Sequence, residues 1–304
     1  MSLSRNTQGS LYMCMAMAGF SCGDALSKSV VQTINAGELI FVRGLFISIF
    51  VWILAWRLGA LKDWRKLFSM PVLVRVLGEG AAAVTYITAL GLMPIANASA
   101  IFQVLPLMIT LGAALFFNEP VGWKRWTAIF VGLTGVLIII RPGTDGFTLG
   151  ALLCVLGVLA TTARDLATRK VDPSVPSLAV TAVNAPIVAI FGAAFTPVLG
   201  EWKPIPLADI VQLLAAALVV FAGYQCSIMA MRHGEISFVA PFRYTSLIFS
   251  ATFGLIFFSE VPDHWAVVGA AIVVASGIYT FYREAKRRVE PLASTSPLGT
   301  GTSI

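Results

Sequence analysis

Charged residues are scarce in this sequence. Only 12% of its 304 residues are Asp, Glu, Lys or Arg, and 58% are hydrophobic, whereas a soluble domain carries about 25% charged residues. This deficit excludes an ordinary soluble protein and indicates a membrane protein. The net charge of +6 comes from short basic clusters between apolar runs. Because no basic face with interleaved aromatic residues is formed, nucleic acid is not expected as a partner.

Histidine and cysteine are also rare. The two histidines, His233 and His264, lie at the ends of apolar runs, which disfavours a histidine base or a histidine-ligated metal at membrane depth. All four cysteines lie inside apolar runs without CxxC spacing, so neither a disulfide framework nor a zinc site is indicated. The phosphate-binding motif GxxxxGK[ST] of ATP-driven pumps is absent. We therefore expect no catalytic site, no metal and no cofactor.

Long apolar runs make up most of the chain. A bilayer core about 30 Å thick needs about 20 apolar residues in a helix. The runs of that length, bounded by charges, Pro or Gly, predict ten transmembrane helices. They cover residues 10–31, 37–57, 72–91, 95–117, 123–140, 149–169, 177–197, 207–231, 236–258 and 264–283.

The basic residues between these runs predict the orientation. Cytoplasmic segments carry an excess of Lys and Arg, and with the N-terminus in the cytoplasm fourteen basic residues fall on that side. Only Lys28, Arg141 and Lys203 fall on the opposite side. An even number of spans also returns the basic cluster at residues 283–288 to the cytoplasm. The sequence therefore predicts a multi-pass protein of the inner (cytoplasmic) membrane with both termini cytoplasmic.

The two halves of the chain repeat one another. A shift of 141 residues places Asp24 on Asp165, Lys28 on Arg169 and Glu119 on Glu260, so the chain consists of two five-span units. Because five is odd, the second unit enters the membrane from the opposite face, which is typical of secondary transporters. We predict an all-α polytopic membrane protein of ten transmembrane helices in two inverted five-helix repeats. The repeats cover residues 1–143 and 144–285, and residues 286–304 form a disordered cytoplasmic tail.

At the end of each half the sequence resembles a known family. The segments are ALGLMPIANASAIFQVLPLMITLGAALFFNEP, from residue 89, and AMRHGEISFVAPFRYTSLIFSATFGLIFFSEV, from residue 230. They are similar to the ten-helix EamA-type branch of the drug/metabolite transporter (DMT) superfamily. The resemblance implies transport of small metabolites across the cytoplasmic membrane, among them amino acids and S-adenosylmethionine, and leaves the solute open.

Two charge patterns recur at the repeat distance. DALSK at residues 24–28 and DLATR at residues 165–169 each place an acid four residues before a base, which puts both charges on one face of a helix. We expect Asp24 with Lys28 and Asp165 with Arg169 to form structural ion pairs near the ends of their helices. The alternative is that the two pairs act as gates on opposite faces, each formed when the other opens.

Charges that the repeat does not duplicate are better candidates for a solute site. An ionisable group at bilayer depth costs about 2.5–3.5 kcal/mol on insertion scales and indicates function by default. Arg43, Glu79 and Arg243 fall on uncharged residues under the shift. Glu79 also has Arg75 one turn away, so an internal ion pair remains the alternative for it. The resemblance implies that the third, fourth, eighth and ninth spans line a central cavity. We therefore predict these substrate-binding residues: Arg43, Glu79, Tyr86, Gln103, Tyr224, Arg243 and Tyr244.

The function that fits these features is secondary transport by alternating access. An arginine suits a carboxylate, a glutamate suits an ammonium group and tyrosine supplies an apolar wall with a hydroxyl, which favours an amphiphilic or zwitterionic solute. Export of amino acids is the first hypothesis, and uptake or exchange of S-adenosylmethionine or a similar cationic metabolite is the second. A membrane receptor or scaffold is the alternative of another class. Expected partners are the solute and the lipid bilayer, with a homodimer left open.

Overall fold

The computed structural model describes residues 4–59, 67–119, 121–142, 148–172 and 174–289, and within these ranges the chain forms helices and no strands. The helices are α1 (Arg5–Val30), α2 (Ala36–Arg57), α3 (Met70–Leu92), α4 (Ile95–Phe102), α5 (Leu105–Phe117), α6 (Trp123–Ile140), α7 (Leu149–Thr168), α8 (Ser177–Leu199), α9 (Leu207–His233), α10 (Ile236–Val239), the 3₁₀ helix η2 (Ala240–Tyr244), α11 (Thr245–Phe258) and α12 (His264–Val289).

These helices account for the ten predicted spans. In the described part of the chain, nine helical segments are long and apolar enough to cross a membrane. The remaining predicted span, the first in the chain, is α1. At 26 residues it is long enough to cross a membrane, but it is less apolar, because it carries Asp24, Lys28 and several serines and glycines. The chain is thus an all-α polytopic membrane protein.

The outer surface of the bundle is apolar. Trp56 and Val198 are each 77% exposed and Phe116 is 73% exposed. A soluble monomer rarely leaves so many large apolar side chains uncovered. Here they form the surface that meets the lipid chains.

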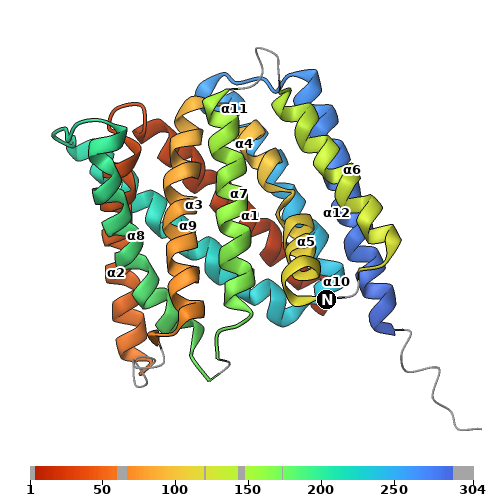
Figure 1. The fold of residues 1–304 in the computed structure, drawn as a ribbon. Helices are drawn as coiled ribbons and strands as arrows, with labels where there is room; N and C mark the ends of the chain where they lie inside the picture. The colour runs from red at the N-terminus through yellow and green to blue at the C-terminus, as the bar shows by residue number, and fades with distance from the viewer. Residues whose placement is uncertain (1–3, 60–66, 120, 143–147, 173, 290–304) are drawn as a thin grey trace, which may run out of the picture.

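Helices from the two halves pack against each other in pairs. In Figure 1, α2 and α8 lie at one side of the bundle, α6 and α12 lie at the other, and α1, α3, α7 and α9 fill the space between them. The shift of 141 residues exchanges the pair α1–α9 with the pair α7–α3. It also places α2 on α8 and α6 on α12, so each of these pairs consists of two equivalent helices. In all four pairs one helix comes from the first half of the chain and the other from the second half.

Small residues allow the closest of these contacts. A Cβ on Gly192 of α8 would lie 2.6 Å from the backbone nitrogen of Phe41 and 2.7 Å from the carbonyl oxygen of Gly37 on α2. Between lipid-embedded helices, packing of this kind replaces the hydrophobic driving force that water supplies to soluble proteins.

One span in each half is interrupted at corresponding places. The span Ile95–Phe117 breaks between α4 and α5, where Pro106 lies in the first turn of α5. Its counterpart passes from α10 through η2 to α11, and Pro241 lies in the first turn of η2. Proline frees a backbone carbonyl and disfavours a continuous helix. These breaks bring the polar residues Gln103 and Arg243 into the interior of the bundle.

Candidate functional site

Three helices of the first half meet at one carboxylate. The hydroxyl of Tyr86 on α3 donates a hydrogen bond to Oδ2 of Asp24 on α1 at 2.7 Å. The guanidinium of Arg43 on α2 lies within electrostatic range of the same carboxylate, and its Nη1 donates to Oγ of Ser27 at 2.9 Å. We name Asp24, Arg43 and Tyr86 the Asp24 cluster.

A second group of charges joins the two halves of the chain. Nη1 of Arg164 on α7 lies 3.0 Å from Oε2 of Glu79 on α3, and its Nε lies 2.8 Å from Oδ1 of Asp165. The three side chains are between 21% and 29% exposed, so all of them are largely buried. We name Glu79, Arg164 and Asp165 the Arg164 cluster. Its position at the contact between repeats is typical of the substrate sites of transporters built from inverted repeats.

Tyr224 of α9 and Arg243 of η2 lie beside these clusters and remain accessible. Tyr224 lies within electrostatic range of Glu79 and Arg164, and yet it is 54% exposed. Arg243 lies within electrostatic range of Asp165 and is also exposed. None of the ion pairs in the described part of the chain includes Arg243, so its guanidinium keeps its capacity to bind an anion.

Gln103 lies between the two interrupted spans. Its side-chain amide donates to Oγ of Ser246 on α11 at 2.5 Å and lies 3.4 Å from the backbone carbonyl of Arg243. Hydrogen bonds of this kind hold membrane helices together. The geometry therefore gives Gln103 a structural contact next to Arg243.

Tyr244 lies within electrostatic range of Arg243, its neighbour in the chain, but its side chain packs against α12. Its ring packs against Phe281 of α12, its side chain is buried, and its hydroxyl occupies the space where Gly277 lacks a Cβ. Neighbouring residues of a helical turn face different directions, so Arg243 and Tyr244 do not share one surface. We do not retain Tyr244 among the solute-binding candidates.

The predicted pairing within DALSK and DLATR is wrong. Lys28 is buried and its Nζ pairs with Oε1 of Glu260, while Asp24 is bound by Tyr86. Arg169 pairs with Glu119, while Asp165 pairs with Arg164. Spacing of four residues makes two side chains neighbours on an isolated helix, but in the folded chain partners from other helices replace that contact.

The structure brings together most of the predicted site and adds one residue. Arg43, Glu79, Tyr86, Tyr224 and Arg243 lie in or beside the two clusters. Arg164 is not among the residues predicted from the sequence, although the shift of 141 residues places it on Gly23. The criterion that singled out Arg43 and Glu79 therefore applies to Arg164 as well. The expected alternative partner of Glu79, Arg75, instead donates to Oγ1 of Thr168 at 2.6 Å.

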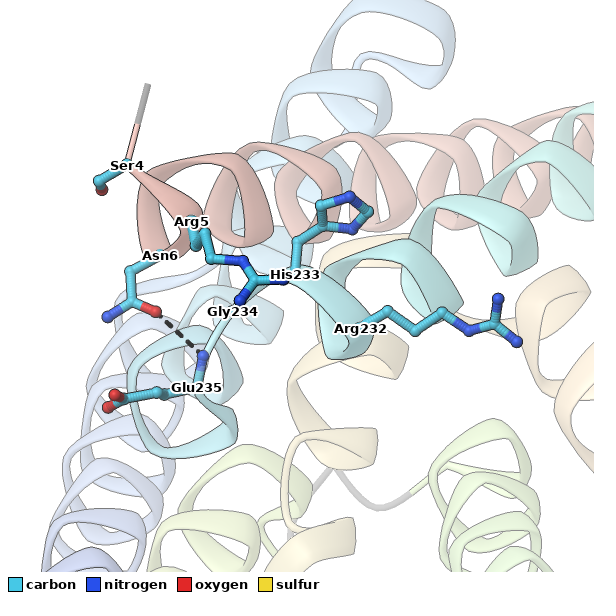
Figure 2. Close-up of a pocket in the computed structure, with 7 residues that line it drawn as sticks. All are labelled: Ser4, Arg5, Asn6, Arg232, His233, Gly234 and Glu235. Carbon is cyan, nitrogen blue, oxygen red and sulfur yellow. Dashed lines mark hydrogen bonds between the residues drawn. The ribbon is translucent and has the colours of Figure 1, made fainter. Parts of the chain in front are cut away.

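A pocket of about 420 Å³ lies at the end of the bundle where α1 begins (Figure 2). In it the side-chain oxygen of Asn6 accepts a hydrogen bond from the backbone N–H of Glu235 at 3.0 Å, and Arg232 points away from the other residues. The pocket is lined by Ser4, Arg5, Asn6, Arg232, His233, Gly234 and Glu235. None of these belongs to the predicted site, so the pocket is a feature of one face of the bundle and not the charge-lined interior.

Comparisons with known proteins agree with this architecture. The EamA-like transporter family matches residues 7–141 and again residues 148–282. A solved crystal structure with 18% sequence identity, which covers 93% of this chain and 99% of its own, superposes with a TM-score of 0.63. This second likeness supports the fold alone.

Three curated relatives are named as transporters. The chain is 27% identical to a riboflavin transporter of Rhizobium johnstonii, over 95% of both chains. It is 26% identical to an S-adenosylmethionine uptake transporter of Rickettsia bellii, over 90% of this chain and 94% of the relative. It is also 26% identical to a pseudopaline exporter of Pseudomonas aeruginosa, over 89% and 94%. The three named solutes differ.

The Arg164 cluster gives a test of how the interior charges are held. Replacing Arg164 with Gln leaves the carboxylates of Glu79 and Asp165 without their cation, and we expect a loss of about 1–3 kcal/mol in unfolding free energy. The double variant Glu79→Gln/Arg164→Gln removes one of the two unpaired carboxylates and should recover part of that loss. Thermal unfolding of the purified protein in detergent measures both changes.

Arg75→Gln is the matched control. Arg75 lies one turn before Glu79 on α3, and its hydrogen bond goes to the hydroxyl of Thr168 and not to a carboxylate. The control substitution should cost less than Arg164→Gln. Equal losses for the two single variants, or no recovery in the double variant, would show that the pair of Glu79 and Arg164 does not stabilise the fold.

Proposed function

We propose a solute and a direction for this chain, which belongs to the EamA-like transporter family and is therefore a membrane transporter and not an enzyme. The proposed function is export of amino acids, or of small metabolites that carry an amino acid group, by alternating access across the cytoplasmic membrane. Membership of this family also removes the basis for the receptor or scaffold alternative.

The balance of charges in the interior supports a zwitterionic solute. The two clusters and Arg243 together hold three carboxylates and three guanidinium groups. A solute with net charge would leave an excess charge at bilayer depth, where it is costly. A zwitterion adds one charge of each sign and keeps the interior neutral. This balance is the observation that carries the proposal.

The exposed groups suggest how such a solute binds. Arg243 offers a planar guanidinium that can hold a carboxylate through two parallel hydrogen bonds. The carboxylates of Asp24 and Glu79 offer partners for an ammonium group, and each already has a neighbour to which it can return when the solute leaves. The exposed ring of Tyr224 supplies an apolar surface with a hydroxyl. In this arrangement Arg43 and Arg164 hold the carboxylates in place.

The relatives support a second candidate, S-adenosylmethionine. Several relatives are named as uptake transporters of that metabolite, which itself carries an amino acid group together with a positively charged sulfonium. Its extra positive charge would require one carboxylate without an arginine partner. Asp24 is the candidate for that role, because its direct hydrogen bond comes from a neutral tyrosine hydroxyl, whereas Arg43 acts on it only at longer electrostatic range. The exporter of Pseudomonas aeruginosa supports export as the direction, and the uptake carriers support the alternative.

We also propose that the protein lies in the inner membrane with both termini in the cytoplasm. The excess of Lys and Arg in the segments on that side supports this orientation. A reporter enzyme that is active only in the cytoplasm, fused after Ile304, should be active. Activity of a periplasmic reporter at the same position would reverse the orientation.

Flux through liposomes tests the proposed function. The purified protein is reconstituted and assayed for exchange of labelled amino acids and of S-adenosylmethionine. We expect flux of at least one amino acid, and we expect Arg243→Ala to lower it by about tenfold or more, because a hydrogen bond to a charged group contributes about 1.5–3 kcal/mol.

Arg232→Ala serves as the control, since Arg232 is also exposed but points away at the end of α9. Its flux should equal that of the native chain. Transport of S-adenosylmethionine without any amino acid would support the second candidate. Amino acid flux that is unchanged in Arg243→Ala would contradict the assignment of the site.

A further inference from the structure

Two ion pairs in this structure are related by the repeat. Lys28 pairs with Glu260, and Nη1 of Arg169 lies 3.1 Å from Oε1 of Glu119. The shift of 141 residues places Lys28 on Arg169 and Glu119 on Glu260. Each pair joins the first half of the chain to the second. Because the halves are inverted, the two pairs are the same contact at opposite ends of the bundle.

The contact at one end is tight. Lys28 is 4% exposed, its Nζ also donates to the carbonyl oxygen of Met93 at 2.6 Å, and it lies 5.4 Å from the ring centroid of Phe258. The second oxygen of Glu260 accepts a hydrogen bond from the backbone N–H of Ile95 at 3.0 Å. This carboxylate therefore binds the lysine and caps the first turn of α4, where anions are favoured.

The equivalent contact at the other end is loose. The side chains of Arg169 and Glu119 are 46% and 53% exposed. Nζ of Lys28 is fixed on the turn at Met93, but the equivalent turn at Gly234 borders the 420 Å³ pocket of Figure 2. The helices at the two ends also differ in how closely they pack. At the Lys28 end, α4 packs along α11. At the other end, the counterpart of α4 (α10 and η2) makes at most marginal contact with the counterpart of α11, which is α5.

We propose that these two ion pairs are the alternating locks of the transporter, and that this structure shows the Lys28–Glu260 lock closed and the Glu119–Arg169 lock open. In the opposite state the halves exchange conformations, so Glu119 and Arg169 become buried and Glu119 caps α10 at the N–H of Ile236. The proposal rests on the alternating access proposed above and goes beyond it, because it assigns the residues that close each end.

The physical basis is the cost of burying charge. A carboxylate in a closed end of the bundle must keep its cation, since an unpaired buried charge is strongly destabilising. In an open end water solvates both partners and the pair contributes little. Removing one lock therefore destabilises only the state in which that end is closed, and it shifts the equilibrium toward the other state.

Distances between spin labels test the proposal without any solute. One label pair, Leu92→Cys with Val261→Cys, reports on the end that holds Lys28. The second, Trp123→Cys with Glu235→Cys, reports on the opposite end. All four positions are exposed. The labels are placed in a chain whose native cysteines are replaced by alanine, and the distances are measured by pulsed electron paramagnetic resonance in nanodiscs.

Lys28→Met and Glu260→Gln should each increase the population with a long Leu92–Val261 distance and a short Trp123–Glu235 distance, by about fivefold or more. Glu119→Gln should have the opposite effect: the population with the long Leu92–Val261 distance should be smaller than in the native chain. Since these readouts are distances, they do not depend on which solute is transported.

Asp263→Asn is the matched control. Asp263 pairs with Arg141 at 2.6 Å at the same end of the bundle, but this pair joins α6 to α12, which already pack along one another. Asparagine also keeps the cap on α12. The control should leave both distances unchanged. An equal shift in the control, or unchanged distances in both Lys28→Met and Glu260→Gln, would overturn the proposal.

If Glu260→Gln does not fold because α4 loses its cap, Lys28→Met decides the question, since it leaves the hydrogen bond to Ile95 in place. If neither variant folds, Glu119→Gln decides it, because that carboxylate is exposed in this state and its loss leaves the fold intact. Depletion of the minor population by Glu119→Gln supports the proposal, and an increase of that population contradicts it.

Discussion

The cost of an unpaired charge inside the bilayer is the constraint on which the rest of this structure depends. Six charged residues belong to the two clusters or lie beside them, and the structure gives most of them a partner from another helix. Tyr86 binds Asp24, and Arg164 binds both Glu79 and Asp165. These contacts determine which helix faces turn inward. They also leave Arg243, which no ion pair in the described part of the chain includes, as the proposed contact for a solute carboxylate.

In the proposed alternating access, the inverted repeat applies this constraint at both ends of the bundle. Contacts that are equivalent by sequence occupy opposite ends of the bundle, so under the proposed alternating access one end can be closed while the other is open. Lys28 with Glu260 is buried while Arg169 with Glu119 is exposed. The interior clusters lie between these two ends, where a solute would be reachable from each side in turn.

Much of the fold follows from the sequence, because the length of the apolar spans and the repeat are both visible in the chain. The candidate site was predicted less completely. Arg43, Glu79, Tyr86 and Arg243 stand out as polar groups at depth, but their partners come from other helices. Local spacing therefore assigned Lys28 to Asp24, and it could not show that Glu260 reaches Lys28 from another helix. The sequence groups Tyr244 with Arg243 because the two residues are adjacent. The 3₁₀ turn of η2, which directs their side chains to different surfaces, is not visible in the sequence.

Binding of solute analogues tests the central claim, that the interior recognises both charges of a zwitterion, most directly. The purified protein is titrated with the twenty amino acids, and then with the amide and the N-acetyl derivative of those that bind. The account predicts that loss of the carboxylate and loss of the ammonium group each weaken binding by about tenfold or more. Equal affinity for the parent amino acid and for either derivative would contradict it.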